Sequence, residues 1–266
     1  MYTRCFWIVS LCLLAAGKGR SQNVPLPYPP IREADVMWAR TYWRVIDFRE
    51  KMNLFFYYPQ GPDKSHNFIQ ILQDAILVTK KVAAYDPLYD DFRIKLTPAE
   101  VMAIWTETLY QSSTRPYPPY DSFDTVVVKR LDPGTVKRLK IKEYCFFDKY
   151  RSRMETRIVG ICPVMERRDQ LSGELRGYSD MFWVYFPELR YILANEKLNL
   201  GFANGIQTLT YDDVFTKRYF SSYLYKEDNV HDRSIPAYLQ SGMDALLESE
   251  RIQETIRLYE HDLWEQ

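Results

Sequence analysis

The amino-acid sequence predicts an α+β fold in which a central antiparallel sheet of about four to six strands is flanked by helices. Three observations predict this class. Apolar residues recur at helical spacing in the first and last thirds of the chain. The middle third is rich in β-branched and aromatic residues that form strand-like runs. These runs follow one another without an intervening helix, which favours antiparallel pairing.

The first 21 residues are typical of a secretory signal peptide. Arg4 supplies the positive start, an apolar stretch follows over 5–17, and small residues precede a cleavage point between Ser21 and Gln22. The apolar stretch is too short to cross a bilayer as a helix, which takes about 20 residues. We therefore expect an exported protein whose mature chain begins at Gln22.

Residues 22–34 are expected to form an extended N-terminal arm. Four of the residues between Pro25 and Pro30 are prolines, which remove backbone donors and disfavour a helix. Two interpretations of the arm stay open, a disordered end or a segment that lies along a neighbouring subunit. The rest of the chain, 35–266, has a length that fits a single α+β domain.

An aromatic block follows the arm at 35–59, and it is expected to be helical. A helix places Val36, Trp43 and Ile46 on one side, and we expect that side to enter the core. The remaining aromatic area must be buried in the protein or against a partner. The candidate subunit contacts are the four consecutive aromatic residues Phe55, Phe56, Tyr57 and Tyr58.

Two more helices are predicted before the strand-rich middle. The first has apolar residues at helical spacing over 68–78, with Ser65 as its expected cap. The second begins at Thr97, where Glu100 completes a capping box. A loop rich in proline and tyrosine is expected over 113–122.

The middle of the chain is expected to form strands over 124–131, 138–148, 153–165 and 180–186. The second and third pair as a hairpin that turns at 149–152. In that register Cys145 faces about residue 156 and Cys162 about residue 139, so their sulfurs are too far apart for a disulfide. We therefore expect two free, buried thiols.

Strand alternation places Arg138, Lys140 and Lys142 on one face of this hairpin. Two interpretations of the basic face stay open. It is either a solvated surface or a docking surface for an acidic partner or an anionic envelope polymer.

Helices return in the last third. Pro187 opens one helix, and a capping box of Thr210 and Asp213 opens another that is expected to continue to 225. A long final helix is expected over 237–263, with one apolar stripe. That stripe packs either on the helix's own domain or, in part, on another subunit.

The sequence contains no recognisable catalytic or metal-binding pattern. The three histidines, His66, His231 and His261, are far apart, and there is no zinc-protease, nucleophile-elbow or phosphate-loop motif. We expect no enzyme activity, cofactor or metal. The chain has 35 basic and 35 acidic residues, and this balance gives no argument for nucleic acid or an anionic membrane as partner.

Three blocks, 35–59, 201–229 and 245–266, resemble the GldN family, also called PorN. This family comprises periplasmic components of the type IX secretion system of Bacteroidetes-type bacteria. The resemblance implies a structural subunit that self-associates in a large ring with an outer-membrane lipoprotein, GldK or PorK. It also implies contact with the inner-membrane protein GldM or PorM, and a role in protein export and, in gliding species, motility.

The same resemblance implies a periplasmic location, with attachment to the outer membrane only through the lipoprotein. It carries no catalytic residue. Two alternatives stay open on the residues alone. The many tyrosines and tryptophans suit a periplasmic glycan- or peptidoglycan-binding module, and dispersed acids suit, less well, a periplasmic hydrolase.

Overall fold

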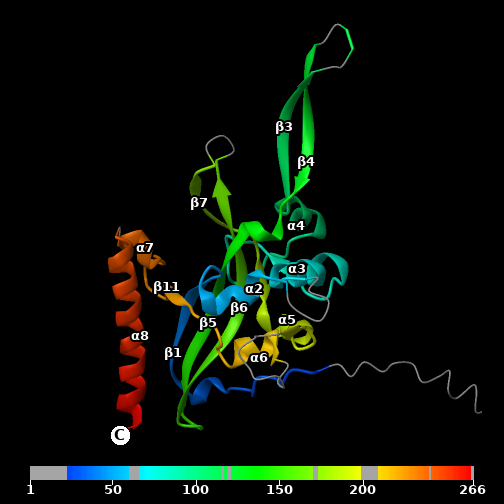
Figure 1. Ribbon diagram of the computed structural model, residues 1–266. Coiled ribbons are helices and arrows are strands. Elements are labelled where there is room, and N and C mark those ends of the chain that lie inside the picture. Colours follow the sequence, from blue (N-terminus) through cyan, green and yellow to red (C-terminus); the bar gives the residue numbers. More distant parts are fainter. Residues whose placement is uncertain are drawn as a thin grey trace, which may run out of the picture.

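The structure, a computed structural model, describes residues 23–59, 66–114, 117–118, 121–169, 173–198, 209–239 and 241–264. The predicted signal peptide and its cleavage point at Ser21 and Gln22 lie outside these residues. The predicted α+β class is confirmed, because a mostly antiparallel sheet is flanked by helices (Figure 1). Among the described residues, no helix combines the length and the apolar character needed to span a bilayer.

The central sheet has seven strands in the order β11-β1-β5-β6-β8-β2, with β7 also paired to β6. All of these pairs are antiparallel, as the unbroken succession of strands predicted. The strands are β1 (Val36–Asp47), β2 (Ala84–Tyr85), β5 (Val136–Asp148), β6 (Arg153–Arg168), β7 (Leu175–Asp180), β8 (Trp183–Tyr185) and β11 (Tyr223–Glu227).

The helix predicted for the aromatic block 35–59 is wrong, because most of it forms strand β1. This strand lies between β11 and β5, and in its second half both faces are largely buried. Trp43 and Val45 are buried on one face, and Tyr42 and Ile46 on the other. When both faces of a strand are buried, apolar residues no longer alternate with polar ones and can imitate helical spacing.

Short helices complete the aromatic block and begin the layer that covers the sheet. They are η2 (Lys51–Asn53) and α2 (Leu54–Tyr57). Next comes α3 (Phe68–Gln73), which continues into a π-helical turn, η3 (Asp74–Val78). Asn67 caps α3 in a capping box with Gln70, whereas the expected cap, Ser65, lies outside the described residues.

The predicted capping boxes open their helices as expected. Thr97 and Glu100 open α4 (Pro98–Ile104), and Thr210 and Asp213 open α6 (Tyr211–Thr216). The expected continuation of the second helix to 225 is wrong, because α6 ends at Thr216 and the chain re-enters the sheet as β11. Between the two lies α5 (Phe186–Leu193), with Pro187 in its first turn, and a small ladder of β9 (Lys197–Leu198) and β10 (Leu209–Thr210).

The main core lies between the sheet and the layer formed by α2, α3, α5 and α6 (Figure 1). Aromatic rings fill it. Phe56 meets Phe68 edge-on at 5.2 Å between centroids, and Phe68 lies 5.3 Å from Tyr211. The aromatic richness of the chain therefore serves its own interior in large part.

The β5–β6 hairpin confirms the predicted turn and the predicted state of the cysteines. Cys145 lies opposite Thr156, as expected, while Cys162 lies opposite Lys140 rather than residue 139. The shift by one residue arises from a β-bulge between Lys142 and Glu143. Both cysteines are free and buried.

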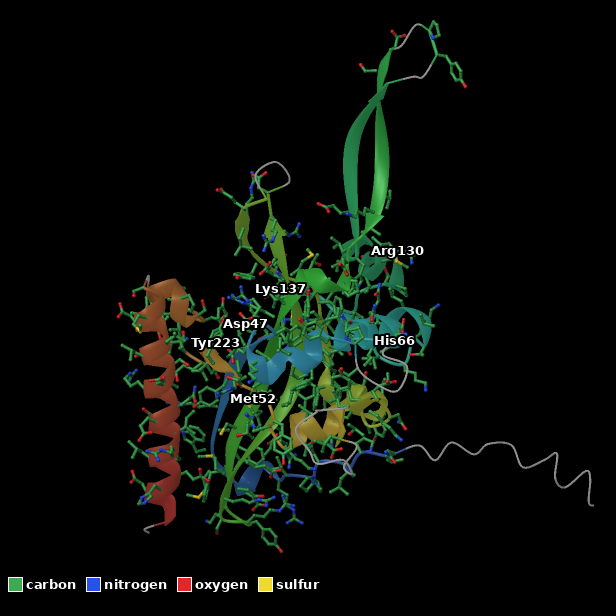
Figure 2. All side chains as sticks on the ribbon, in the orientation of Figure 1. Asp47, Met52, His66, Arg130, Lys137 and Tyr223 are labelled. Carbon is green, nitrogen blue, oxygen red and sulfur yellow. The ribbon has the colours of Figure 1, made fainter. Side chains whose placement is uncertain are left out.

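A second hairpin, β3 (Thr106–Thr114) and β4 (Ser122–Arg130), stands away from the body beyond α4 (Figure 1). Its second strand was predicted and its first was not. The two strands pair only with each other among the described residues. Figure 2 shows Arg130 at the base of this hairpin, close to the body.

The predicted long C-terminal helix is confirmed as α8 (Gly242–Trp264), preceded by α7 (Ile235–Tyr238). It packs on its own chain at the β11 end of the sheet (Figure 1). Ile252 is buried against Tyr42 and Leu224, and the Leu224 N–H donates a 2.9 Å hydrogen bond to Ser249 Oγ. The inner stripe of the helix thus covers the outer edge of β11.

Candidate interaction surfaces

The aromatic run at the end of the first block divides between core and surface. Phe55 and Phe56 are buried, with their ring centroids 4.3 Å apart. Tyr57 is half-buried, and Tyr58 is 54% exposed. A subunit contact by this run stays a prediction, and Tyr58 and Tyr57 are the residues available to make it.

Arg138, Lys140 and Lys142 do share one face of β5, and each already has an acidic partner. Arg138 Nε lies 3.1 Å from Asp47 and Lys140 Nζ lies 2.7 Å from Asp180. Lys142 Nζ lies 3.2 Å from an Asp90 carboxylate oxygen. The two lysine side chains are only 17% exposed, so this face is not a freely solvated surface.

Aromatic rings also contact the three cations. Arg138 lies over Tyr178 at 3.8 Å, and Lys140 over Tyr225 at 4.7 Å, measured to the ring centroids. Lys142 lies 5.4 Å from the Trp43 ring. Such cation–π contacts stabilise by about 0.5–2 kcal/mol each. Docking of an acidic partner stays a prediction, and that partner would have to displace carboxylates already in place.

The pKa of Lys140 shows how firmly this face is paired. Burial lowers the pKa of Lys140, but the charge of the neighbouring Asp180 and its hydrogen bond together raise it by more than burial lowers it. The net pKa therefore lies above its ordinary value. The lysine therefore stays charged and bound to Asp180 throughout the physiological range.

The loop that carries Phe92 crosses part of this face, and its packing explains why residue 160 is a glycine. The Phe92 ring lies over Gly160 in β6, where a Cβ atom would approach it to 2.3 Å. Phe92 also meets Tyr185 edge-on at 5.6 Å. Gly160 lies opposite Lys142, beside the β-bulge of this hairpin.

Asp47 joins the end of β1 to its neighbours. Its carboxylate accepts hydrogen bonds from Arg49 Nε at 2.9 Å and Arg138 Nε at 3.1 Å. Burial raises the pKa of Asp47, but these hydrogen bonds lower it more, so its net pKa is depressed. Figure 2 labels Asp47 in the body, beside Tyr223 of the neighbouring strand.

The N-terminal arm is extended, as predicted, and its described part lies on the chain's own body. A position along a neighbouring subunit, one of the two interpretations left open by the sequence, stays a prediction. Arg190 Nη1 donates to the Leu26 carbonyl at 2.8 Å, and Arg157 Nη2 donates to the Pro29 carbonyl at 2.8 Å. Asn23 N–H donates to Asn195 Oδ1 at 3.0 Å. The arm is thus bound at several points along its length.

The groove that holds the arm lies between β6 and α5 and leaves a volume of about 500 Å³. Pro25, Pro27, Tyr28 and Ile31 of the arm line this space together with side chains of the body. Arg190 is itself buried and paired with Asp212 at 2.7 Å, so its position is fixed. Sequence reasoning missed Arg157 and Arg190, because arginine–carbonyl pairs so distant along the chain leave no local pattern. The groove-lining tyrosines are Tyr28, Tyr144, Tyr185 and Tyr191.

A larger groove, of about 1090 Å³, separates the base of the β3–β4 hairpin from the β6–β7 hairpin. Acidic and basic side chains alternate along it. Glu166 accepts a 2.9 Å hydrogen bond from Arg168 and lies 3.2 Å from Lys137 Nζ. This balance of charge matches no single class of charged ligand. Within the described residues, histidine, cysteine and acidic side chains form no group of three or more that could hold a metal ion.

Comparison with known proteins identifies the family. A family model described as "Gliding motility associated protein GldN" matches residues 31–265. The match begins at the end of the arm and includes both the projecting hairpin and α8. A search of curated proteins found no match. Because the family model covers most of the chain, this protein belongs to the GldN family of gliding motility associated proteins.

Proposed function

We propose that this protein is a non-enzymatic structural subunit of the type IX protein secretion machinery. The observation that carries the proposal is the GldN family match over 31–265, because that family is associated with gliding motility and type IX secretion. The protein is exported to the periplasm by the signal peptide at 1–21. It supports protein export and, in gliding species, motility.

In this proposal the subunits form a periplasmic ring with a GldK- or PorK-like outer-membrane lipoprotein and contact a GldM- or PorM-like inner-membrane protein. Two features support an assembly role. The β3–β4 hairpin stands away from the body, and its strands pair only with each other in the described part of the chain. Unpaired strand edges readily accept a strand of another protein.

The second feature is the outer side of α8. Leu246, Leu247 and Leu258 are exposed on it, although the inner stripe already satisfies the packing of this helix. Exposed leucines on a helix that is anchored elsewhere suit a contact with another protein.

The test is to purify the tagged protein from its native host in mild detergent. We expect it to elute as a large assembly that contains the lipoprotein, with a mature N-terminus at Gln22. A strain that lacks the protein should lose secretion of its type IX substrates, and the wild-type gene should restore it. A monomer without the lipoprotein, in a strain whose secretion is normal, would contradict the proposal. A monomer that binds peptidoglycan would instead favour a glycan-binding module.

A further inference from the structure

The arm at 23–31 contacts the body in the way that a bound peptide contacts a receptor. It forms no strand, and Arg157 and Arg190 of the body donate hydrogen bonds to two of its backbone carbonyls. The Tyr28 ring lies between the same two guanidinium groups, at 5.2 Å and 4.7 Å from its centroid. These contacts depend on the extended backbone of the arm and on the Tyr28 ring, and none of them involves the covalent connection of the arm to the body.

The spacing of these contacts fits an extended, proline-rich ligand. The two bonded carbonyls, those of Leu26 and Pro29, are three residues apart, which is one turn of a polyproline II helix. They therefore face the same side of the arm, towards β6 and α5. Prolines lower the conformational entropy that such a segment loses on binding. This saving is the same whether the groove belongs to the arm's own chain or to another copy.

The connection between the arm and the body is short and lightly held. Arg32, Glu33 and Ala34 are exposed, and the Asp35 N–H bonds only locally, to the Arg32 carbonyl. The first tether to the sheet is the bond from Lys149 N–H to the Asp35 carbonyl, at 2.9 Å. Moving the arm to another groove would break its own contacts and change the backbone at 32–34, while the tether of Asp35 to the sheet stays in place. Exchange of an identical element between copies is a low-cost route to assembly.

We propose that in the assembled state the groove between β6 and α5 binds the arm of an adjacent copy of this chain, so that arms link neighbouring subunits. This inference rests on the proposed self-association. Isolated chains fill their grooves with their own arms. Assembly holds neighbouring arms at a high effective concentration, and the same contacts then form between chains.

The test uses two differently tagged full-length chains co-expressed in the native host. One carries Pro27→Cys in the arm and the other carries Glu188→Cys in the groove, since both positions are exposed and line the same groove. A short bismaleimide is added to the purified assembly. We expect a covalent product that carries both tags, at least tenfold above the level in mixtures with only one of the two substitutions.

The wild-type chain is the background control, because its two described cysteines, Cys145 and Cys162, are buried. A single chain that carries both substitutions reports reaction within one copy, and thermal unfolding checks that each variant folds. If assemblies form and only the within-chain product appears, arm exchange is wrong while the proposed function stands. If no assembly forms with the wild-type chain, both the arm exchange and the proposed function are contradicted.

Discussion

The two long hairpins of this protein, β3–β4 and β5–β6, have similar antiparallel ladders but differ in the elements that surround them. β5–β6 has β1 on one side and β7 and β8 on the other. β3–β4 has no further strand beside it in the described part of the chain and meets the body at α4. The first hairpin buries residues such as Ile141 and Phe146 completely. Neighbouring elements, rather than the ladder itself, therefore decide whether a hairpin contributes to a core or remains available to a partner.

An isolated two-stranded hairpin is at best marginally stable in water. β3–β4 nevertheless extends over nine residue pairs, well beyond what a connection between α4 and the next strand requires. Its length therefore accords with a role outside the body, and removing it tests the comparison most directly.

The largest expected effect is on assembly. Replacing 107–129 with a short glycine–serine linker should abolish the large complex and give a monomer, because the projecting strand edges are lost. The free energy of unfolding should change by no more than about 0.5 kcal/mol, as for other surface changes. Size-exclusion chromatography and urea unfolding measure the two effects, with Tyr117→Ser at the exposed hairpin end as the control. A complex of normal size would show that the hairpin is dispensable.

The next effect sharpens the contrast between the two hairpins. Ile141→Ala in β5 should lower the free energy of unfolding by about 2–5 kcal/mol, because the residue is fully buried and its loss leaves a cavity. Val128→Ala in β4, which removes an exposed side chain, should cost no more than about 0.5 kcal/mol. Urea denaturation followed by tryptophan fluorescence compares them. Equal losses would mean that the hairpins do not differ in this way.

A smaller effect concerns the pH dependence of the body. The pKa of Asp47 is depressed in the folded state, so its stabilisation is present above the unfolded pKa of about 3.9 and is lost as the pH falls through the folded value. Asp47→Asn should cost about 1–2 kcal/mol at pH 7 and less at pH 3, below the unfolded pKa. The cost is modest because Arg49 is half exposed and its pairing with Asp47 is screened. Urea unfolding at several pH values measures this, with the exposed Asp121→Asn as control. A loss that is equal at both pH values would contradict the assignment.

The smallest effect concerns the thiols of β5 and β6. Burial raises the pKa of both Cys145 and Cys162, so neither forms a thiolate readily in the folded protein. A thiol reagent at pH 8 should react only slowly with the folded mature chain. In denaturant it should react readily with both cysteines. Rapid labelling of Cys162 in the folded state would show that the centre of the sheet opens.

Local signals predicted local structure well. The capping boxes at Thr97 and Thr210 marked helix starts, since each depends on contacts within one turn. The hairpin turn placed Cys145 opposite Thr156. The expected register of Cys162 differs from the structure by one residue because of the bulge beside Lys142. Gly160 beside this bulge lies under Phe92, a contact distant in the sequence that leaves no local signal.

The failures came where burial is set by distant neighbours. The sequence predicts a helix at β1, because a strand with both faces buried has a continuous apolar run that cannot be told from a buried helix. It also predicts a helix at β11, although pairing with Trp43 and Val45 makes this segment a strand. The basic face was predicted correctly as a face, but its carboxylate partners Asp90 and Asp180 come from other elements.

The bond between the Leu224 N–H and Ser249 Oγ has a consequence for how copies of this protein can meet. With α8 across it, β11 cannot act as a template for a strand from another molecule. At the opposite end of the sheet, β2 is only two residues long and Tyr85 is bridged by Lys95. Crowded copies therefore cannot join sheet to sheet into fibrils through these two edges, and ordered growth is left to other parts of the molecule.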